Sequence, residues 1–92
     1  MTAGSVSKTL KIVNEKGLHA RAAAAFVRMA DSFKAKITVE KDDQIVSGHS
    51  IMGLMMLGAA CGSEIKVGCS GEDAQKALDA LEKLVNEKFN EN

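Results

Sequence analysis

The chain has 92 residues, of which 46% are hydrophobic and 26% charged, and this size and balance predict one compact domain over residues 1–92. Twelve basic and 12 acidic residues give a formal net charge of +0, which removes the electrostatic case for a nucleic-acid binder or a polybasic membrane anchor. With three Phe and no Trp or Tyr, an aromatic platform for stacking RNA bases is not expected. No apolar run reaches the roughly 18 residues that span a bilayer. No signal-peptide pattern begins the chain, so we expect a cytoplasmic protein.

The first half of the chain predicts a strand, a helix and a hairpin. Leu10 and Ile12 alternate with polar neighbours, as in a half-buried strand. Apolar residues then recur at helical spacing up to Phe33, after a turn that ends in Gly17. The elements expected here, in chain order, are a strand over residues 8–13, a turn over 14–17, a helix over 20–33, and a hairpin of strands 35–40 and 44–47.

The second half predicts a short helix, a strand and a long helix. Ser50 is a good N-cap and Gly58 a stop signal for the apolar run between them. Ser70 with Asp73 three residues later resembles a capping box before the last helix, whose apolar stripe extends as far as Phe89. The elements expected here are a helix over residues 51–57, a strand over 64–69 and a helix from residue 74 onward.

The order of elements is therefore βαββαβα. Each predicted helix with a clear stripe is apolar on one side only, so the helices must cover one face of a single four-stranded sheet. This predicts an α+β fold with two layers.

Two cysteines, Cys61 and Cys69, occur without a CxxC pair or the Cys/His spacing of a zinc site. We expect two free thiols in a reducing compartment. Nothing else in the sequence predicts a metal site or a cofactor.

The segment Gly17-Leu18-His19-Ala20-Arg21 lies where a turn passes into a helix. The first backbone N–H groups of a helix have no partner inside it, and with the helix dipole they favour an anion. A neutral imidazole at His19 and the guanidinium of Arg21 would add a nucleophile and phosphate-matched donors. The arrangement predicts a site for a transient phosphohistidine, and the alternative is a surface histidine that caps the helix poorly beside an ordinary solvated arginine.

The run from Ile51 to Leu57 is apolar all round, so a helix this short cannot bury every side chain in a small core. We expect Ile51, Met52 and Met55 to be exposed, because methionine suits a surface that binds several partners. The alternative is that all the large side chains belong to the core. His49 is expected to be a surface residue.

Three separate blocks resemble one known family. They are GLHARAAAAF, SGHSIMGLMMLG and SGEDAQKALDALEKLV, and their order and spacing are those of the HPr family of histidine-containing phosphocarrier proteins from the bacterial phosphoenolpyruvate-dependent phosphotransferase system. The resemblance covers about residues 8–89. It implies an open-faced β-sandwich in which three helices cover one face of a four-stranded antiparallel sheet, in agreement with the order of elements above.

The resemblance also implies roles for particular residues. His19 matches the histidine that enzyme I phosphorylates at Nδ1, and Arg21 matches the arginine that steadies the phosphoryl group. Ser50 matches a regulatory serine that receives phosphate from ATP in members served by an HPr kinase/phosphorylase. The helix that begins at Ile51 matches the one that contacts enzyme I. One departure is Ala22, where the family pattern His-x-Arg-Pro has proline, and its loss is expected to leave the site less preorganised.

A protein of this kind is expected to be a monomer that passes phosphate from enzyme I to enzyme IIA domains, as a stoichiometric carrier and not a turnover catalyst. One alternative is a carrier of the nitrogen-related branch with mainly regulatory output. Others are a small non-catalytic interaction module, a small hydrolase or an RNA reader. A hydrolase needs a second catalytic group near the anion site, and an RNA reader needs exposed aromatics and basic bias, and the sequence has neither.

Overall fold

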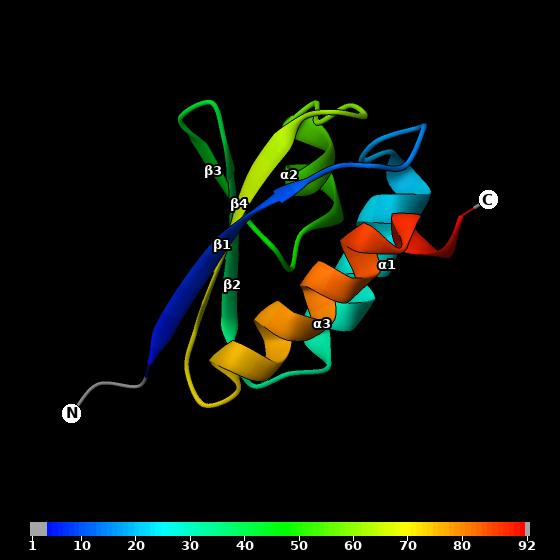
Figure 1. The fold of residues 1–92 in the computed structure, drawn as a ribbon. Coiled ribbons are helices and arrows are strands. Elements are labelled where there is room, and N and C mark those ends of the chain that lie inside the picture. The colour runs from blue at the N-terminus through cyan, green and yellow to red at the C-terminus, as the bar shows by residue number, and fades with distance from the viewer. Residues whose placement is uncertain (1–3, 92) are drawn as a thin grey trace.

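The fold is an open sheet with helices on one side, and the computed structural model describes residues 4–91 (Figure 1). The predicted domain bounds of 1–92 therefore include residues 1–3 and 92, which lie outside the described part. The elements are β1 (Ser5–Lys11), α1 (Ala20–Asp31), β2 (Lys36–Lys41), β3 (Gln44–Ser47), α2 (Ile51–Met56), β4 (Glu64–Ser70), α3 (Ala74–Asn86) and the 3-10 turn η1 (Lys88–Asn90).

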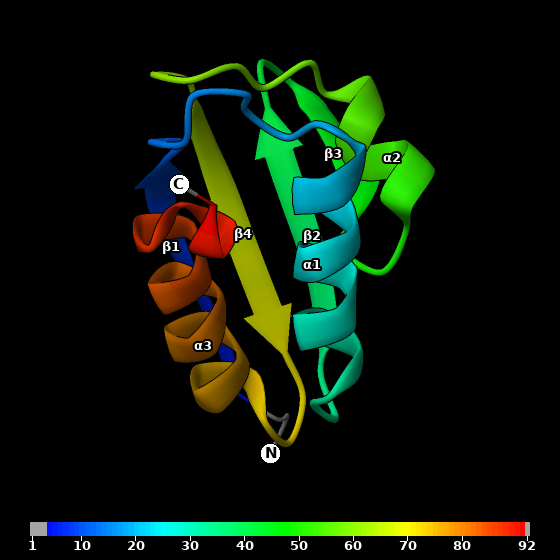
Figure 2. The same cartoon turned by 90° about the vertical axis from the view of Figure 1, so that its right-hand side faces the viewer.

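The four strands form one sheet in the order β1-β4-β2-β3, and every neighbouring pair is antiparallel. The three helices all lie on the same side of it, with α1 and α3 across its face and α2 beside β3 (Figures 1 and 2). The predicted α+β fold is confirmed. Within residues 4–91 no helix is long and apolar enough to cross a membrane.

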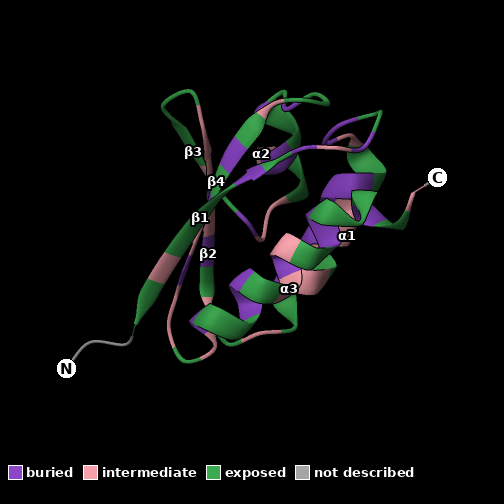
Figure 3. Cartoon of the chain, in the orientation of Figure 1, coloured by how far each residue is buried: buried purple, intermediate pink, exposed green. Residues whose placement is uncertain are grey.

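The core lies between the sheet and the helices, where alternate strand residues meet the apolar helical stripes (Figure 3). Ile65 and Val67 on the central strand β4 are fully buried, and so are Phe26 of α1 and Leu81 of α3. This is the period of two in the strands and of about 3.6 in the helices that the sequence predicted. The core fixes α1 on the sheet, and with it the loop that precedes α1.

The predicted β2–β3 hairpin is confirmed. Its turn is made by Asp42 and Asp43, whose φ values are 49° and 69°. Two successive residues with positive φ are typical of a type I′ turn, whose twist matches that of the flanking strands.

Two predicted details at the last helix are wrong. Ser70 and Asp73 form no capping box, because Ser70 is the final residue of β4 and pairs with Ser5 in the sheet. Asp73 is the N-cap residue without a side-chain cap bond, and its Oδ2 instead accepts from the Lys34 backbone N–H at 2.8 Å. The apolar stripe of the last helix was also predicted to extend to Phe89, but α3 ends at Asn86, and Phe89 is buried in η1.

Candidate functional site

The loop before α1 is held against the loop after α2. Gly17 has a φ of 68°, and a Cβ there would lie 2.5 Å from the Ala59 carbonyl oxygen. Both facts require glycine at this position. The next residue, Leu18, is buried and its N–H donates to the same carbonyl at 2.9 Å. The backbone at His19 is therefore fixed by its predecessors, and it lies beside the segment that follows α2.

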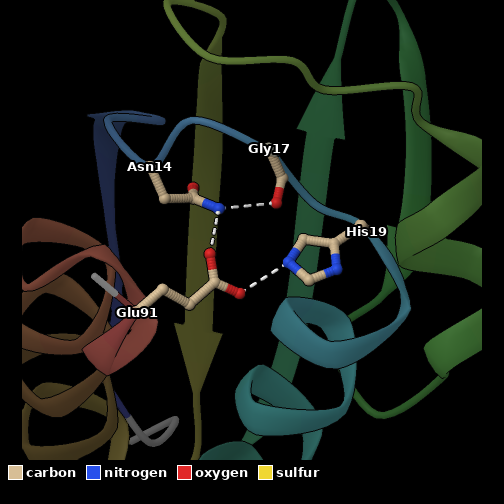
Figure 4. Close-up of polar contacts among 4 residues, drawn as sticks. All are labelled: Asn14, Gly17, His19 and Glu91. Atoms are coloured by element: carbon tan, nitrogen blue, oxygen red, sulfur yellow. Dashed lines mark hydrogen bonds and ion pairs between the residues drawn. The ribbon is translucent and has the colours of Figure 1, made fainter.

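His19 is the N-cap residue of α1, and its carbonyl accepts the first helical hydrogen bond, from the Ala23 N–H at 2.8 Å. Its imidazole makes no cap bond. The ring turns instead toward the C-terminal segment, where Nε2 lies 2.5 Å from Oε2 of Glu91 (Figure 4). The side chain is 29% exposed. The predicted histidine thus lies at the predicted helix start and is accessible, with one ring nitrogen held by a carboxylate.

Glu91 is the residue beside His19 that the sequence did not predict. Its second oxygen, Oε1, accepts from Asn14 Nδ2 at 3.0 Å (Figure 4). Burial would raise the pKa of this carboxyl, but hydrogen bonds from His19 and Asn14, and the charges of His19 and Lys16, outweigh it and hold the pKa below its usual range. The site therefore includes an ionised carboxylate at neutral pH.

Arg21 lies in the first turn of α1 and is exposed. Together with His19 and Lys16 it lines a half-open pocket whose other side is formed by η1 and Glu91. Two cationic side chains, the carboxylates of Glu15 and Glu91, and the start of α1 thus border the pocket that holds the imidazole. This is an environment suited to a phosphoryl group on the ring.

Ser50 is the N-cap of α2, as predicted, and its Oγ accepts from the Gly53 N–H at 3.0 Å. The predicted exposure of Ile51, Met52 and Met55 is confirmed at 42%, 69% and 42%. Met56 is also exposed, at 72%, and was not predicted. We call these four apolar residues the α2 surface. The helix still contributes to the core through Leu54, which is fully buried.

His49 precedes Ser50, and its Nδ1 lies 2.7 Å from Oδ1 of Asp31 in α1. Its side chain is 32% exposed, so the surface position expected for it is confirmed. Cys61 is an exposed free thiol and Cys69 a buried one, and burial raises the pKa of the Cys69 thiol. Among residues 4–91 no cluster of three or more His, Cys, Asp or Glu side chains could hold a metal ion.

Replacing Ala22 with proline is expected to stabilise the domain by about 0.4 to 1 kcal/mol, measured by urea unfolding. The first helical bond is donated by Ala23, so the Ala22 N–H has no helical partner to lose. The control, Ala24→Pro, removes a bond inside the helix and should cost roughly 3 kcal/mol. Since Ala22 is fully buried, a clear loss of stability in Ala22→Pro would mean that its surroundings cannot accept the ring.

An open-faced α+β sandwich with an accessible histidine at the start of its first helix defines the class of HPr-like domains. A family model described as "PTS HPr component phosphorylation site" matches residues 6–87, and the chain belongs to this family. Membership gives it the role of a phosphocarrier in the phosphotransferase system.

Relatives in this family are similar over almost their whole length. The chain is 44% identical over 86 residues to the phosphocarrier protein HPr of Neisseria meningitidis serogroup A. The matched residues cover 94% of this chain and 97% of that protein. The crystal structure of HPr-C-His from Thermoanaerobacter tengcongensis matches with a TM-score of 0.91 and 44% identity, over 95% of this chain and 98% of that one. A crystal structure described as an HPr dimer from the same organism matches with a TM-score of 0.76 and 45% identity, over 89% and 94% of the two chains.

Proposed function

We propose that this chain carries a phosphoryl group on Nδ1 of His19, which it accepts from phosphorylated enzyme I and gives to enzyme IIA domains. The Nδ1 lone pair attacks phosphorus, the new N–P bond forms, and the N–P bond of the donor phosphohistidine breaks. The donor imidazole keeps the electron pair of that bond. No water and no further reactant takes part, so the protein acts as a stoichiometric carrier.

The observation that supports this proposal best is the state of the His19 ring. Its Nε2 is engaged by Glu91, whereas Nδ1 makes no cap bond and is left for another reactant. The ring borders a pocket that also holds Arg21, and it lies within the stretch matched by the family's phosphorylation-site model. A nucleophilic nitrogen beside cationic donors is the arrangement that phosphoryl transfer needs.

The direct test is incubation with phosphoenolpyruvate and enzyme I. We expect one added phosphoryl group by mass spectrometry, lost in acid and retained in base, since a phosphoramidate hydrolyses in acid whereas a serine ester does not. Fragmentation should place the group on the peptide that contains His19. A phosphate that survives acid would point to a hydroxyl acceptor and contradict the proposal.

Replacing Arg21 with alanine should slow transfer by about tenfold or more, because a charge-assisted bond to phosphate contributes roughly 1.5 to 3 kcal/mol. The unfolding free energy should stay within about 0.5 kcal/mol of wild type, since the side chain is exposed. Quenched-flow labelling gives the rate, and Arg28→Ala, an exposed arginine in the last turn of the same helix, is the matched control. Equal rates in Arg21→Ala and Arg28→Ala would remove Arg21 from the mechanism.

The α2 surface is proposed as the docking site for enzyme I and enzyme IIA domains. Four large apolar side chains on one six-residue helix are left without cover in this chain, and exposed apolar patches of this kind mark binding sites. The Leu18–Ala59 bond ties the segment after α2 to the residue before His19. A partner that covers α2 is therefore brought to the phosphorylation site.

Ser50 is proposed as a regulatory site for a kinase of the HPr kinase/phosphorylase type. Its hydroxyl already accepts from the Gly53 N–H, so a phosphate there would meet a donor group of the helix start. It would also place negative charge at the edge of the α2 surface. The alternative role, a plain N-cap, is compatible with the same geometry and needs no kinase.

The expected monomer and the expected cytoplasmic location belong to the same proposal. A dimer is described for one relative, so sedimentation at the working concentration is the measurement for this chain. A mainly regulatory role in the nitrogen-related branch uses the same chemistry at His19. It differs in its output, which is regulation and not sugar uptake.

A further inference from the structure

We propose that Glu91 is a positioning residue for phosphoryl transfer, whose carboxylate holds the His19 ring in the tautomer that leaves Nδ1 free of a proton. The inference deepens the proposed function of His19 and rests on it. Glu91 contacts Nε2 of the ring, and Nδ1 is the nitrogen that receives the phosphoryl group. Glu91 acts through the opposite nitrogen of the ring.

A hydrogen bond joins the side chains of His19 and Glu91. The His19 Nε2 atom lies 2.5 Å from Oε2 of Glu91. Because the carboxyl pKa is held below its usual range, Glu91 is ionised at neutral pH and can only accept. The hydrogen must therefore be on Nε2. A neutral imidazole carries a single ring hydrogen, so its Nδ1 then has the lone pair that attacks phosphorus.

Asn14 fixes the direction of the carboxylate. It is 1% exposed, and its Nδ2 donates to the Gly17 carbonyl at 2.8 Å and to Oε1 of Glu91 at 3.0 Å (Figure 4). The amide orientation is determined, since the opposite assignment would place an oxygen against two acceptors. With Oε1 anchored in this way, Oε2 is presented to His19. The carboxylate of Glu91 is thus held at both oxygens, one by Asn14 and the other by His19.

The backbone before Glu91 is bent to bring it there. Lys88, Phe89 and Asn90 have φ values of 59°, 55° and 61°, and none is glycine. A left-handed conformation costs Lys88 and Phe89 roughly 1 to 2 kcal/mol each and costs Asn90 less, so it persists only where the surroundings enforce it. Phe89, buried at 6% exposure, anchors the turn, and the two hydrogen bonds of Glu91 lie just beyond it. The chain reverses after α3 and returns to the start of α1.

The same carboxylate has a use during the reaction. As Nδ1 bonds to phosphorus, positive charge develops on the ring, and a carboxylate on Nε2 stabilises that charge. Glu91 contacts the Nε2 side of the ring, and the bond to phosphorus forms at the other ring nitrogen, Nδ1. The Nε2 hydrogen remains in place before and after transfer, and the step balances without a proton acceptor.

The test measures the tautomer first, on the unphosphorylated protein without enzyme I. The ¹⁵N shifts and couplings of the His19 ring should show the Nε2–H form in the wild type at a pH where the ring is neutral. Glu91→Ala should give a mixture of both tautomers, and Glu91→Gln should keep most of the Nε2–H form, since an amide oxygen still accepts. Glu87→Ala removes an exposed carboxylate from the same end of the chain and should resemble wild type.

The transfer rates should follow the tautomers. Glu91→Ala is expected to accept phosphate from enzyme I about tenfold more slowly, the order expected for the loss of one charge-assisted hydrogen bond. Glu91→Gln should recover most of the rate, and Glu87→Ala all of it. An unchanged ¹⁵N pattern in Glu91→Ala would overturn the inference, and so would an equal or faster rate, because the carboxylate would then be idle or obstructive. A wild-type protein that takes no phosphate on His19 would instead overturn the proposed function, and the ¹⁵N result would still report whether Glu91 sets the tautomer.

Discussion

His19→Ala is expected to abolish the acid-labile phosphate completely while the protein stays folded. No other imidazole in the chain borders the pocket at the start of α1, since the second histidine, His49, pairs with Asp31. The His19 ring makes no cap bond and is partly exposed, so its removal should leave α1 in place. Mass spectrometry after incubation with phosphoenolpyruvate and enzyme I measures the label, and circular dichroism measures the fold.

His49→Ala is the matched control, because it also removes one imidazole and one contact with a carboxylate. It should be labelled like the wild type. Labelling of His19→Ala to the wild-type extent would place the phosphate elsewhere. The Ser50→Ala variant would then show whether the hydroxyl had become the acceptor.

The elements that the sequence predicted well are those with a strong hydrophobic period. In β4, Ile65, Val67 and Cys69 are all buried, and the residues between them are Lys66 and Gly68. In α3 the predicted apolar stripe from Ala74 to Val85 is buried without exception. The predicted first helix runs to Phe33, whereas α1 ends at Asp31, where Ser32 Oγ donates to the Met29 carbonyl at 2.6 Å. Helix ends depend on such local bonds, which a period does not reveal.

The carboxylate beside His19 could not be predicted in the same way. His19 and Glu91 are 72 positions apart, and their contact depends on a left-handed turn that includes Lys88 and Phe89, residue types that rarely adopt one. A glycine in that turn would have been a visible signal, but the sequence there is Lys-Phe-Asn. The one hint in the sequence was Phe89, an apolar residue that follows the polar residues after the end of α3. Phe89 is buried in η1, the turn that precedes Glu91 and its contact with His19.

The exposure of the α2 surface could be predicted only in part from the composition of the helix. The sequence indicated that a short helix apolar all round must leave side chains uncovered, and this is correct. Met56 was missed, although it follows Met52 by one helical turn and so shares its face. Leu54, which is fully buried, marks the side that faces the core, and Gly53 lies so near β3 that a Cβ there would be 3.2 Å from Cβ of Val46. The side of α2 that faces the core depends on tertiary packing, and the spacing of apolar residues within one helix does not reveal it.

The second large effect is expected at Ser50. Ser50→Asp should slow phosphoryl transfer from enzyme I by more than tenfold, a penalty of at least about 1.4 kcal/mol. Aspartate is as good an N-cap as serine, so the Gly53 N–H keeps an acceptor and the melting temperature should stay close to that of the wild type. The new charge adjoins Ile51 at the edge of the α2 surface, which we have proposed as the docking site for enzyme I carrying a phosphohistidine. Like charge and the cost of desolvating the carboxylate both oppose that contact.

Two further variants separate charge from capping. Ser50→Asn keeps a capping oxygen without the charge and should accept phosphate at nearly the wild-type rate. Met52→Glu adds a charge to the α2 surface without touching the cap, at a side chain that is 69% exposed, and should be as slow as Ser50→Asp. Its control, Met52→Leu, keeps the surface apolar and should transfer normally. If Ser50→Asp and Met52→Glu both accept phosphate at the wild-type rate, enzyme I does not bind the α2 surface, and Ser50 serves only as the cap of α2.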